Sequence, residues 1–203
     1  MQRVNHPNIA KLYDVIETDT QVILVMEYIN GGSTHGYLKS KPNRRMDEHN
    51  AKKIISQLIS ALQYLHSKCI AHRDIKLENV MLDQNRNVKL IDFGFSTQIP
   101  NTQKVKLFCG TPSYMAPEIV QKLEFCGPPA DVYASGVLLF AFFCGCFPFR
   151  GQNDKELYKK IATADLVLPD HIPSGPRYLL KYMLKKNAEE RPTAGDLLQD
   201  PWI

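Results

Sequence analysis

Residues 70–94, IAHRDIKLENVMLDQNRNVKLIDFG, say more about the fold than any other part of the chain. Two short apolar runs, 80–82 and 88–91, flank five polar residues of the kind that form turns. Apolar, β-prone runs joined by such a turn predict a β-hairpin. Because a hairpin brings its outer ends together, Asn79 and Asp92 are expected to be neighbours although they are thirteen positions apart in the sequence.

The ends of this predicted hairpin collect groups that suit phosphoryl transfer. Asp92 offers a carboxylate and Asn79 an amide carbonyl, which are hard oxygen ligands for Mg²⁺ held partly by substrate phosphates. Asp74 can orient and deprotonate a hydroxyl, and the Lys76 ammonium beside it can offset phosphate charge. A lone His-Arg-Asp triplet would favour a simple polar turn. The full spacing H-R-D-x-K-x-x-N followed by D-F-G favours the catalytic reading.

These residues, together with the run APE at 116–118, resemble the eukaryotic protein kinase family. Lys76 and the run GTPSY at 110–114 are similar to its serine/threonine branch. The runs FCGTPSYMAPEIV at 108–120 and DPWI at 200–203 resemble its calmodulin-dependent and AMP-activated-like group. The resemblance covers the whole chain and implies an α+β, protein-kinase-like fold. That fold would have a mostly helical large lobe and a remnant of the β-rich small lobe.

The resemblance also implies how the chain is divided. Residues 1–26 would be the small-lobe remnant, made of the end of a helix and two strands at 9–17 and 21–26. Residues 27–32, EYINGG, would be the hinge between the lobes, and residues 33–203 would form the large lobe.

Periodicity predicts the helices. Apolar residues recur at helical spacing between 51 and 65, which predicts a helix over 47–67 with Asp47 as its N-cap. The polar stretch before position 117 is expected to be a flexible loop that ends in a short helix at 117–120. Further helices are expected at 131–146, 155–162, 176–184 and 194–198, and the start of the chain, 1–7, reads as a helix end.

Composition limits the class of protein. With 203 residues and 44% hydrophobic content, the chain can bury the core of one large domain. A net charge of +4 is too small to predict nucleic-acid binding. Five cysteines without C-x-x-C spacing favour reduced thiols in a cytoplasmic protein. The uncharged run 132–149 is near the lower length limit of a membrane span, but its glycines and proline favour a buried helix, so no span is expected.

By resemblance, the cofactors are ATP and Mg²⁺, and the partner is a protein substrate with a serine or threonine hydroxyl. Asp74 would orient the hydroxyl and accept its proton, Lys76 would stabilise the transferring phosphate, and Asn79 and Asp92 would hold Mg²⁺. Four further residues would bind adenine: Met26 as the gatekeeper, Glu27 and Ile29 through their backbones, and Met81 beneath the ring.

The remaining assignments implied by the resemblance concern support and substrate. Glu118 and Arg191 would form an ion pair that braces the activation segment, the alternative being two separate surface charges. Asp131 would hold the backbone of the loop at His72 and Arg73, and Arg73 would pair with an activating phosphate. Thr111 would contact Asp74, Lys76 and the substrate, the alternative being a plain turn threonine. Glu78 would face substrate arginines, while Met1, Leu12, His72 and Phe93 would stack between the lobes.

Three departures from the family pattern matter. No glycine-rich loop, phosphate-binding lysine strand or paired helical glutamate occurs in residues 1–203, so an upstream small-lobe segment or a regulatory partner would have to supply them. By resemblance, Leu107 occupies the place of an activating phosphothreonine, so either the loop is ordered without a phosphate there or Thr102 nearby substitutes. Ser33 and Ala141 stand where arginine-selecting relatives carry acids.

Two other functions therefore remain open beside a serine/threonine kinase. One is a non-catalytic, pseudokinase-like scaffold or regulator, which the missing lysine favours and the intact Asp74, Asn79 and Asp92 disfavour. The other is a small-molecule phosphotransferase with a similar core, which the APE run and the peptide-docking segment before it disfavour.

Overall fold

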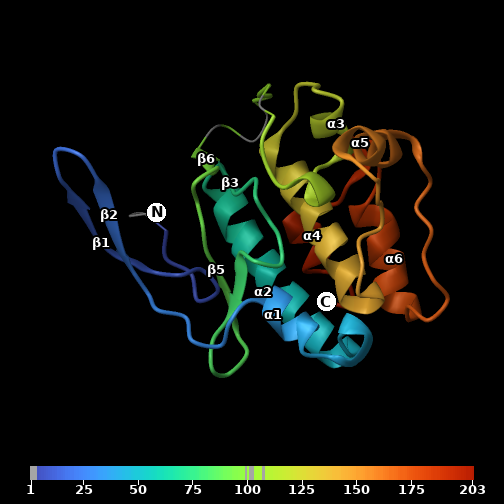
Figure 1. Cartoon of the computed structure of the whole chain (residues 1–203), viewed down its shortest axis with the longest axis horizontal. Coiled ribbons are helices and arrows are strands. Elements are labelled where there is room, and N and C mark those ends of the chain that lie inside the picture. Colours follow the sequence, from blue (N-terminus) through green and yellow to red (C-terminus); the bar gives the residue numbers. More distant parts are fainter. Residues whose placement is uncertain (1–3, 99, 101–102, 107) are drawn as a thin grey trace.

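Two helices, α2 (Glu48–Ser67) and α4 (Gly127–Cys144), form the centre of the chain's helical body (Figure 1). The structure is a computed structural model that describes residues 4–98, 100, 103–106 and 108–203. Met1, Thr102 and Leu107 lie outside these residues. The other elements are β1 (Leu12–Glu17), β2 (Val22–Met26), α1 (Thr34–Lys39), β3 (Ile70–Ala71), β4 (Val80–Leu82), β5 (Val88–Leu90), β6 (Thr97–Gln98), α3 (Pro117–Val120), α5 (Asp154–Thr163), α6 (Ser174–Met183) and α7 (Ala194–Leu197), with 3₁₀ turns η1 (Pro42–Arg44), η2 (Pro112–Tyr114) and η3 (Ala188–Glu190).

The helix α2 forms where the apolar stripe predicted it. Its buried face includes Ile55, Leu58 and Leu62, all fully shielded from solvent. The Asp47 carboxylate accepts a hydrogen bond from the backbone N–H of Asn50 at 2.9 Å, which confirms the predicted N-cap.

The helix α4 is buried on all sides, with Tyr133 and Phe142 among its fully enclosed side chains. It begins four residues earlier than periodicity suggested. Pro128 and Pro129 lie in its first turn, where no backbone N–H is needed inside the helix. By length and composition α4 could cross a membrane, but 89% of it is buried inside the fold, as in a core helix.

The predicted hairpin of residues 80–91 is present as the antiparallel pair β4–β5. Its register pairs Val80 with Leu90 and Leu82 with Val88. Asp83 shapes the turn, because its Oδ1 accepts from the backbone N–H groups of Asn85 and Asn87 at 2.8 Å each.

The β1–β2 hairpin projects from the helical body at the left of Figure 1. Its apolar side chains are largely uncovered: Val22 is 64% exposed and Leu24 51% exposed. The hairpin is tied to the body at its base, where the Ala10 N–H donates to the Leu90 carbonyl at 3.0 Å. The helix end expected over 1–7 is wrong for residues 4–6, which form no helix. Pro7 cannot donate the backbone hydrogen bond that closes a helical turn, and the residue before a proline is biased away from the helical conformation.

The connector 27–33 leaves β2 and runs beside β4. The Gly31 N–H donates to the Leu82 carbonyl at 2.9 Å, and the Leu82 N–H donates to the Gly32 carbonyl at 2.8 Å. A Cβ atom at Gly31 would lie 2.4 Å from the carbonyl oxygens of both Leu82 and Asp83. The close approach of connector and hairpin therefore requires glycine at this position.

The polar segment before α3 is partly ordered by pairing with other elements. β6 pairs antiparallel with β3, and Val105 bridges to Phe125. The short helix predicted at 117–120 is confirmed as α3. The last helix, α7, starts at the predicted N-cap, Thr193, which forms a reciprocal capping box with Asp196.

Candidate active site

The carboxylate of Asp74 is the centre of a hydrogen-bonded cluster. Asp74 is only 3% exposed. Its Oδ2 accepts from Lys76 Nζ at 2.5 Å and from Asn79 Nδ2 at 3.0 Å, and its Oδ1 accepts from the Thr111 hydroxyl at 3.0 Å. Lys76 Nζ also lies 3.3 Å from Thr111 Oγ1. Four residues expected to act together are thus in direct contact, and the aspartate is fixed in one orientation.

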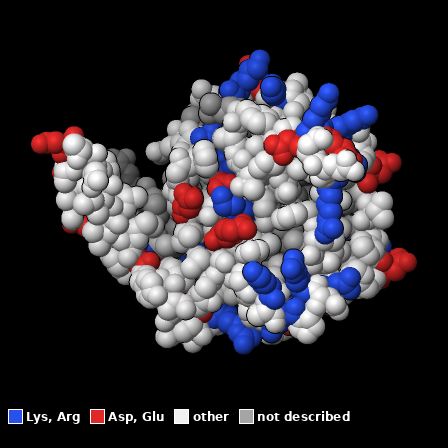
Figure 2. Space-filling model, in the orientation of Figure 1, with Lys and Arg blue, Asp and Glu red and all other residues white. Residues whose placement is uncertain are grey.

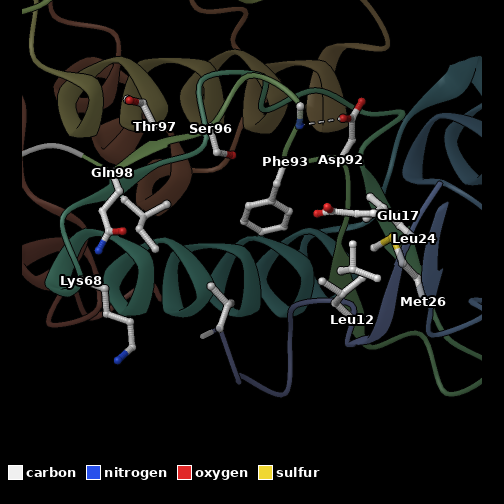
Figure 3. Close-up of a pocket in the computed structure, with 14 residues that line it drawn as sticks. Leu12, Glu17, Leu24, Met26, Lys68, Asp92, Phe93, Ser96, Thr97 and Gln98 are labelled. Carbon is white, nitrogen blue, oxygen red and sulfur yellow. Dashed lines mark hydrogen bonds between the residues drawn. The ribbon is translucent and has the colours of Figure 1, made fainter. Parts of the chain in front are cut away.

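Asn79 and Asp92 lie at adjoining ends of the β4–β5 hairpin. The Ile91 N–H donates to the Asn79 backbone carbonyl at 3.0 Å, which places Asp92 next to that end. The Asn79 amide nitrogen donates to the Asp74 backbone and side chain, at 2.9 and 3.0 Å, so the amide carbonyl turns away from Asp74. Asp92 accepts from the Gly94 N–H at 3.1 Å through one oxygen, leaving the other for a further ligand (Figure 3).

This donor set fits Mg²⁺. A carboxylate and an amide carbonyl are hard oxygen ligands, and Mg²⁺ commonly binds through one or two such groups while keeping water and substrate phosphates. Asp92 has a left-handed backbone with φ of 62°. Such a conformation is uncommon for an aspartate and turns the chain sharply at this point.

His72 links the Asp74 loop to the Asp92 segment. It is fully buried, its Nε2 lies 2.9 Å from the Ile91 carbonyl and its Nδ1 lies 3.3 Å from the Asp74 N–H. These partners require Nε2 to donate and Nδ1 to accept, which is the neutral tautomer. Burial lowers the pKa of His72, in agreement with that form. The His72 ring also lies edge-on to the Phe93 ring, with the two ring centroids 4.9 Å apart.

Asp131, on α4, supports the same loop from below. It accepts from the backbone N–H groups of His72 and Arg73 at 2.9 and 2.8 Å, as the resemblance implied. A third partner, His66 Nε2 at 2.9 Å, was missed by the sequence reasoning. The available signal was weak: His66 continues the buried stripe of α2, where periodicity indicates core rather than a polar contact.

The ion pair expected between Glu118 and Arg191 is bidentate. Both carboxylate oxygens of Glu118 accept from the guanidinium at 2.7 Å. The Arg191 side chain is 0% exposed and also lies over the Tyr133 ring, 4.9 Å from its centroid. The pair fastens α3, and with it the end of the polar segment before α3, to the C-terminal part of the chain.

Arg73 and Glu78 stand at the edge of the cluster. Arg73 has φ of 65°, and its Nε donates to the Phe95 carbonyl at 2.6 Å. Its Nη1 is buried without a partner among the described residues. Glu78 is exposed on the surface of the loop. Leu107 and Thr102, which bear on any activating phosphate, lie outside the described residues.

The residues expected to bind adenine lie along the connector and β4. Met26 ends β2, Ser33 bridges to Met81, and Glu27 pairs with Lys89 at 2.8 Å. The Glu27 N–H donates to the Lys11 carbonyl at 2.9 Å, so the backbone carbonyl of Glu27 is the group left for the predicted contact with adenine. The N–H of Glu27 is used instead in β-pairing with Lys11, the residue just before β1.

A cavity of about 1000 Å³ opens between the β1–β2 hairpin and β6 (Figure 3). Leu12, Leu24 and Met26 line its hairpin side, and Asp92 and Phe93 line the opposite side. Glu27, Ile29 and Met81 are not among its lining residues. The cavity therefore connects the hairpin's apolar face with the metal-ligand end of the site.

Comparison with known proteins settles the family. The model of the protein kinase domain matches residues 1–203. The chain belongs to the protein kinase domain family. It is also 37% identical, over all of its 203 residues, to a protein described as "Probable serine/threonine-protein kinase MARK-A" from Dictyostelium discoideum.

The family assignment confirms the predicted kinase-like fold, and the similarity is to a serine/threonine kinase, in agreement with the predicted branch. This kinase domain chain spans 19% of that relative's length. The closer resemblance to the calmodulin-dependent and AMP-activated-like group stays a prediction.

Proposed function

We propose that this protein is a serine/threonine protein kinase that transfers the γ-phosphoryl group of ATP to a protein hydroxyl. The observation that carries the proposal is the Asp74 carboxylate, held at once by Lys76, Asn79 and Thr111. A buried carboxylate with so many donors is oriented for one task, and the task that fits these neighbours is positioning a hydroxyl for phosphoryl transfer.

In this proposal each member of the cluster has one role. Asp74 orients the serine or threonine hydroxyl and accepts its proton, and Lys76 stabilises charge on the transferring phosphoryl group. Thr111 holds both side chains and contacts the substrate. Asn79 and Asp92 would hold Mg²⁺, which when bound offsets the charge of the ATP phosphates.

Supporting residues keep that geometry. Asp131 fixes the loop backbone through His72 and Arg73, while the Glu118–Arg191 pair fixes the activation segment. Arg73 would meet an activating phosphate, since its Nη1 has no partner among the described residues.

We further propose that the division into a small-lobe remnant at 1–26, a hinge at 27–32 and a large lobe at 33–203 holds for this chain. The connector beside β4 supports the hinge, with Met26, Glu27, Ile29 and Met81 around the adenine. The cavity next to Phe93 would receive an upstream small-lobe segment or a regulatory partner. The five free cysteines agree with a cytoplasmic location.

A non-catalytic regulator is the second candidate, because residues 1–203 contain no glycine-rich loop and no phosphate-binding lysine strand. The two functions differ in their response to mutation. Asp74→Asn and Asp92→Ala in the full-length protein are expected to abolish phosphate incorporation into peptide while circular dichroism stays unchanged. Asp170→Asn, at a fully exposed side chain, is the matched control and should keep full activity.

The proposed binding of Mg²⁺ by Asp92 can be tested separately. Asp92→Ala should weaken the affinity for ATP in the presence of Mg²⁺ and leave the metal-free affinity unchanged. Turnover at the unmutated rate in either site variant would rule out the proposed roles.

A further inference from the structure

A hollow of about 240 Å³ lies beside the active-site loop, between α1, η1 and the C-terminal end of α4. Its wall includes Leu77, Ala141 and Phe147, and three of its lining residues are basic: His35, Lys39 and Arg44. Its lining contains no aspartate or glutamate. The hollow is thus an apolar-walled depression with cationic groups at its rim.

The hollow is close enough to Asp74 for one substrate to reach both. Leu77 follows Asp74 by three positions, so their Cα atoms are at most about 11 Å apart. Leu77 is held in place, because its N–H donates to the Tyr114 hydroxyl at 3.1 Å and its carbonyl accepts from the Thr34 hydroxyl at 2.8 Å. An extended peptide advances about 3.3–3.6 Å per residue. A residue about two to five positions from the phosphorylated one would therefore lie over the hollow.

The charges of the hollow are available to a ligand. His35, Lys39 and Arg44 are all exposed. In the described part of the chain, neither Lys39 nor Arg44 forms a salt bridge with a carboxylate. Figure 2 shows lysine and arginine side chains in the lower part of the face, where Figure 1 places α1.

The nearest acidic group on the loop is Glu78, which follows Leu77 and is exposed. Ala141, at a position where arginine-selecting relatives carry an acid, is buried in the wall of the hollow and brings only a methyl group. The local field in the hollow is therefore positive rather than negative.

We propose that this hollow binds an anionic side chain of the protein substrate, two to five positions from the phosphorylated residue. The ligand group is a carboxylate or a phosphoserine, and His35, Lys39 and Arg44 recognise its charge. This inference rests on the proposed kinase function and names its substrate class: peptides with an acidic or already phosphorylated residue two to five positions from the acceptor. The preference for acidic residues should be confined to the substrate position that lies over the hollow, because Glu78 repels an acidic residue placed beside Glu78 itself.

The test uses the full-length protein and a peptide set with one acceptor serine. Each peptide carries Asp, phosphoserine, Ala or Arg at one of the positions two to five residues before or after the acceptor. At one of these positions, Asp or phosphoserine should raise kcat/KM about three- to tenfold over Ala, and Arg should lower it. The gain should shrink as ionic strength rises, since the contacts are solvent-accessible. A larger gain for phosphoserine than for Asp would identify phosphate as the preferred group.

A double variant tests the residues. Lys39→Glu with Arg44→Glu should remove the preference for Asp and create one for Arg. Lys159→Glu with Lys181→Glu makes the same change in net charge on exposed positions of α5 and α6 and should leave the preference intact. Selection for arginine by the unmutated protein, or an acidic preference that survives in the Lys39 and Arg44 variant, would overturn the inference.

A binding arm separates this inference from the proposed function. Fluorescent peptides with alanine in place of the acceptor serine are titrated with the protein, and anisotropy reports their affinity. If the acidic alanine peptides bind preferentially but none of the serine peptides is phosphorylated, the kinase activity is rejected and the anion site is kept. Phosphorylation without any acidic preference would keep the kinase and reject the anion site.

Discussion

Replacing Arg191 by alanine should be one of the most destabilising single changes in this chain. The guanidinium donates to both oxygens of Glu118 at 2.7 Å, and to the carbonyls of Lys185, Lys186 and Pro129 at 2.8, 3.1 and 3.1 Å. All five of its N–H groups are therefore used inside the protein. Truncation would leave a carboxylate whose side chain is 10% exposed, and three carbonyls, without these donors.

The magnitude follows from the burial of the pair. Breaking a buried ion pair by removing one partner costs about 3–5 kcal/mol, because the remaining charge stays buried and uncompensated. For a chain of about 200 residues, each kcal/mol changes Tm by about 2–4 °C. Arg191→Ala is therefore expected to lower Tm by about 6–20 °C. Arg191→Met combined with Glu118→Leu should cost less than the single change, because it removes both charges together.

Thermal unfolding followed by circular dichroism measures these differences in the isolated variants. Lys160→Ala is the control, since it breaks the Lys160–Glu156 pair, which has a similar 2.7 Å contact but lies on the surface. Its effect on Tm should be small, because exposed pairs gain little from their charges. If Arg191→Ala lowered Tm no more than Lys160→Ala, or if the double change cost more than the single one, the argument from burial would be refuted.

Two further predictions concern pH and nucleotide binding. Burial lowers the pKa of His72, so the folded form holds it neutral and stability is complete only above the ordinary histidine pKa of about 6.5. The free energy of unfolding, measured by urea titrations between pH 5 and 8, should decrease as the pH falls below that value. His72→Gln should make this dependence on pH weaker. An equal dependence on pH in the two proteins would contradict the assignment. Residues 1–203 expressed alone should bind ATP with Mg²⁺ more weakly than about 1 mM and show no detectable transfer, because they contain no glycine-rich loop and no lysine strand for the α- and β-phosphates. A soluble monomer that phosphorylates peptide at ordinary kinase rates would disprove this.

Short-range sequence patterns predicted the elements that are stabilised by interactions between residues close in the sequence. The stripe from 51 to 65 and the cap at Asp47 gave α2, and the turn after Leu82 gave the β4–β5 hairpin. Both depend on interactions between residues close in sequence. The strands β3 and β6 were not predicted, because elements of two residues are too short to carry any periodic signal.

Contacts across long sequence distances came from resemblance alone. Glu118 and Arg191 are 73 positions apart, and no spacing rule connects them. The contact of His66 with Asp131, 65 positions away, was absent from the expectations because a histidine on a buried stripe reads as core. The Glu27 backbone was predicted to contact adenine, but the sequence could not show that its N–H pairs with Lys11, because that pairing depends on tertiary register.

At Arg73 and Asp92, the left-handed backbone favours glycine for stability, whereas the site needs the side chains that are present. At φ of 65° and 62°, glycine would be the least strained residue at both positions. Each non-glycine residue there costs of order 1–3 kcal/mol. A lineage selected for stability alone would drift toward glycine at these two sites and would lose a guanidinium and a carboxylate in doing so. If the guanidinium and the carboxylate are what keep glycine out, related chains that have lost catalysis should carry glycine at these two positions more often than active relatives do.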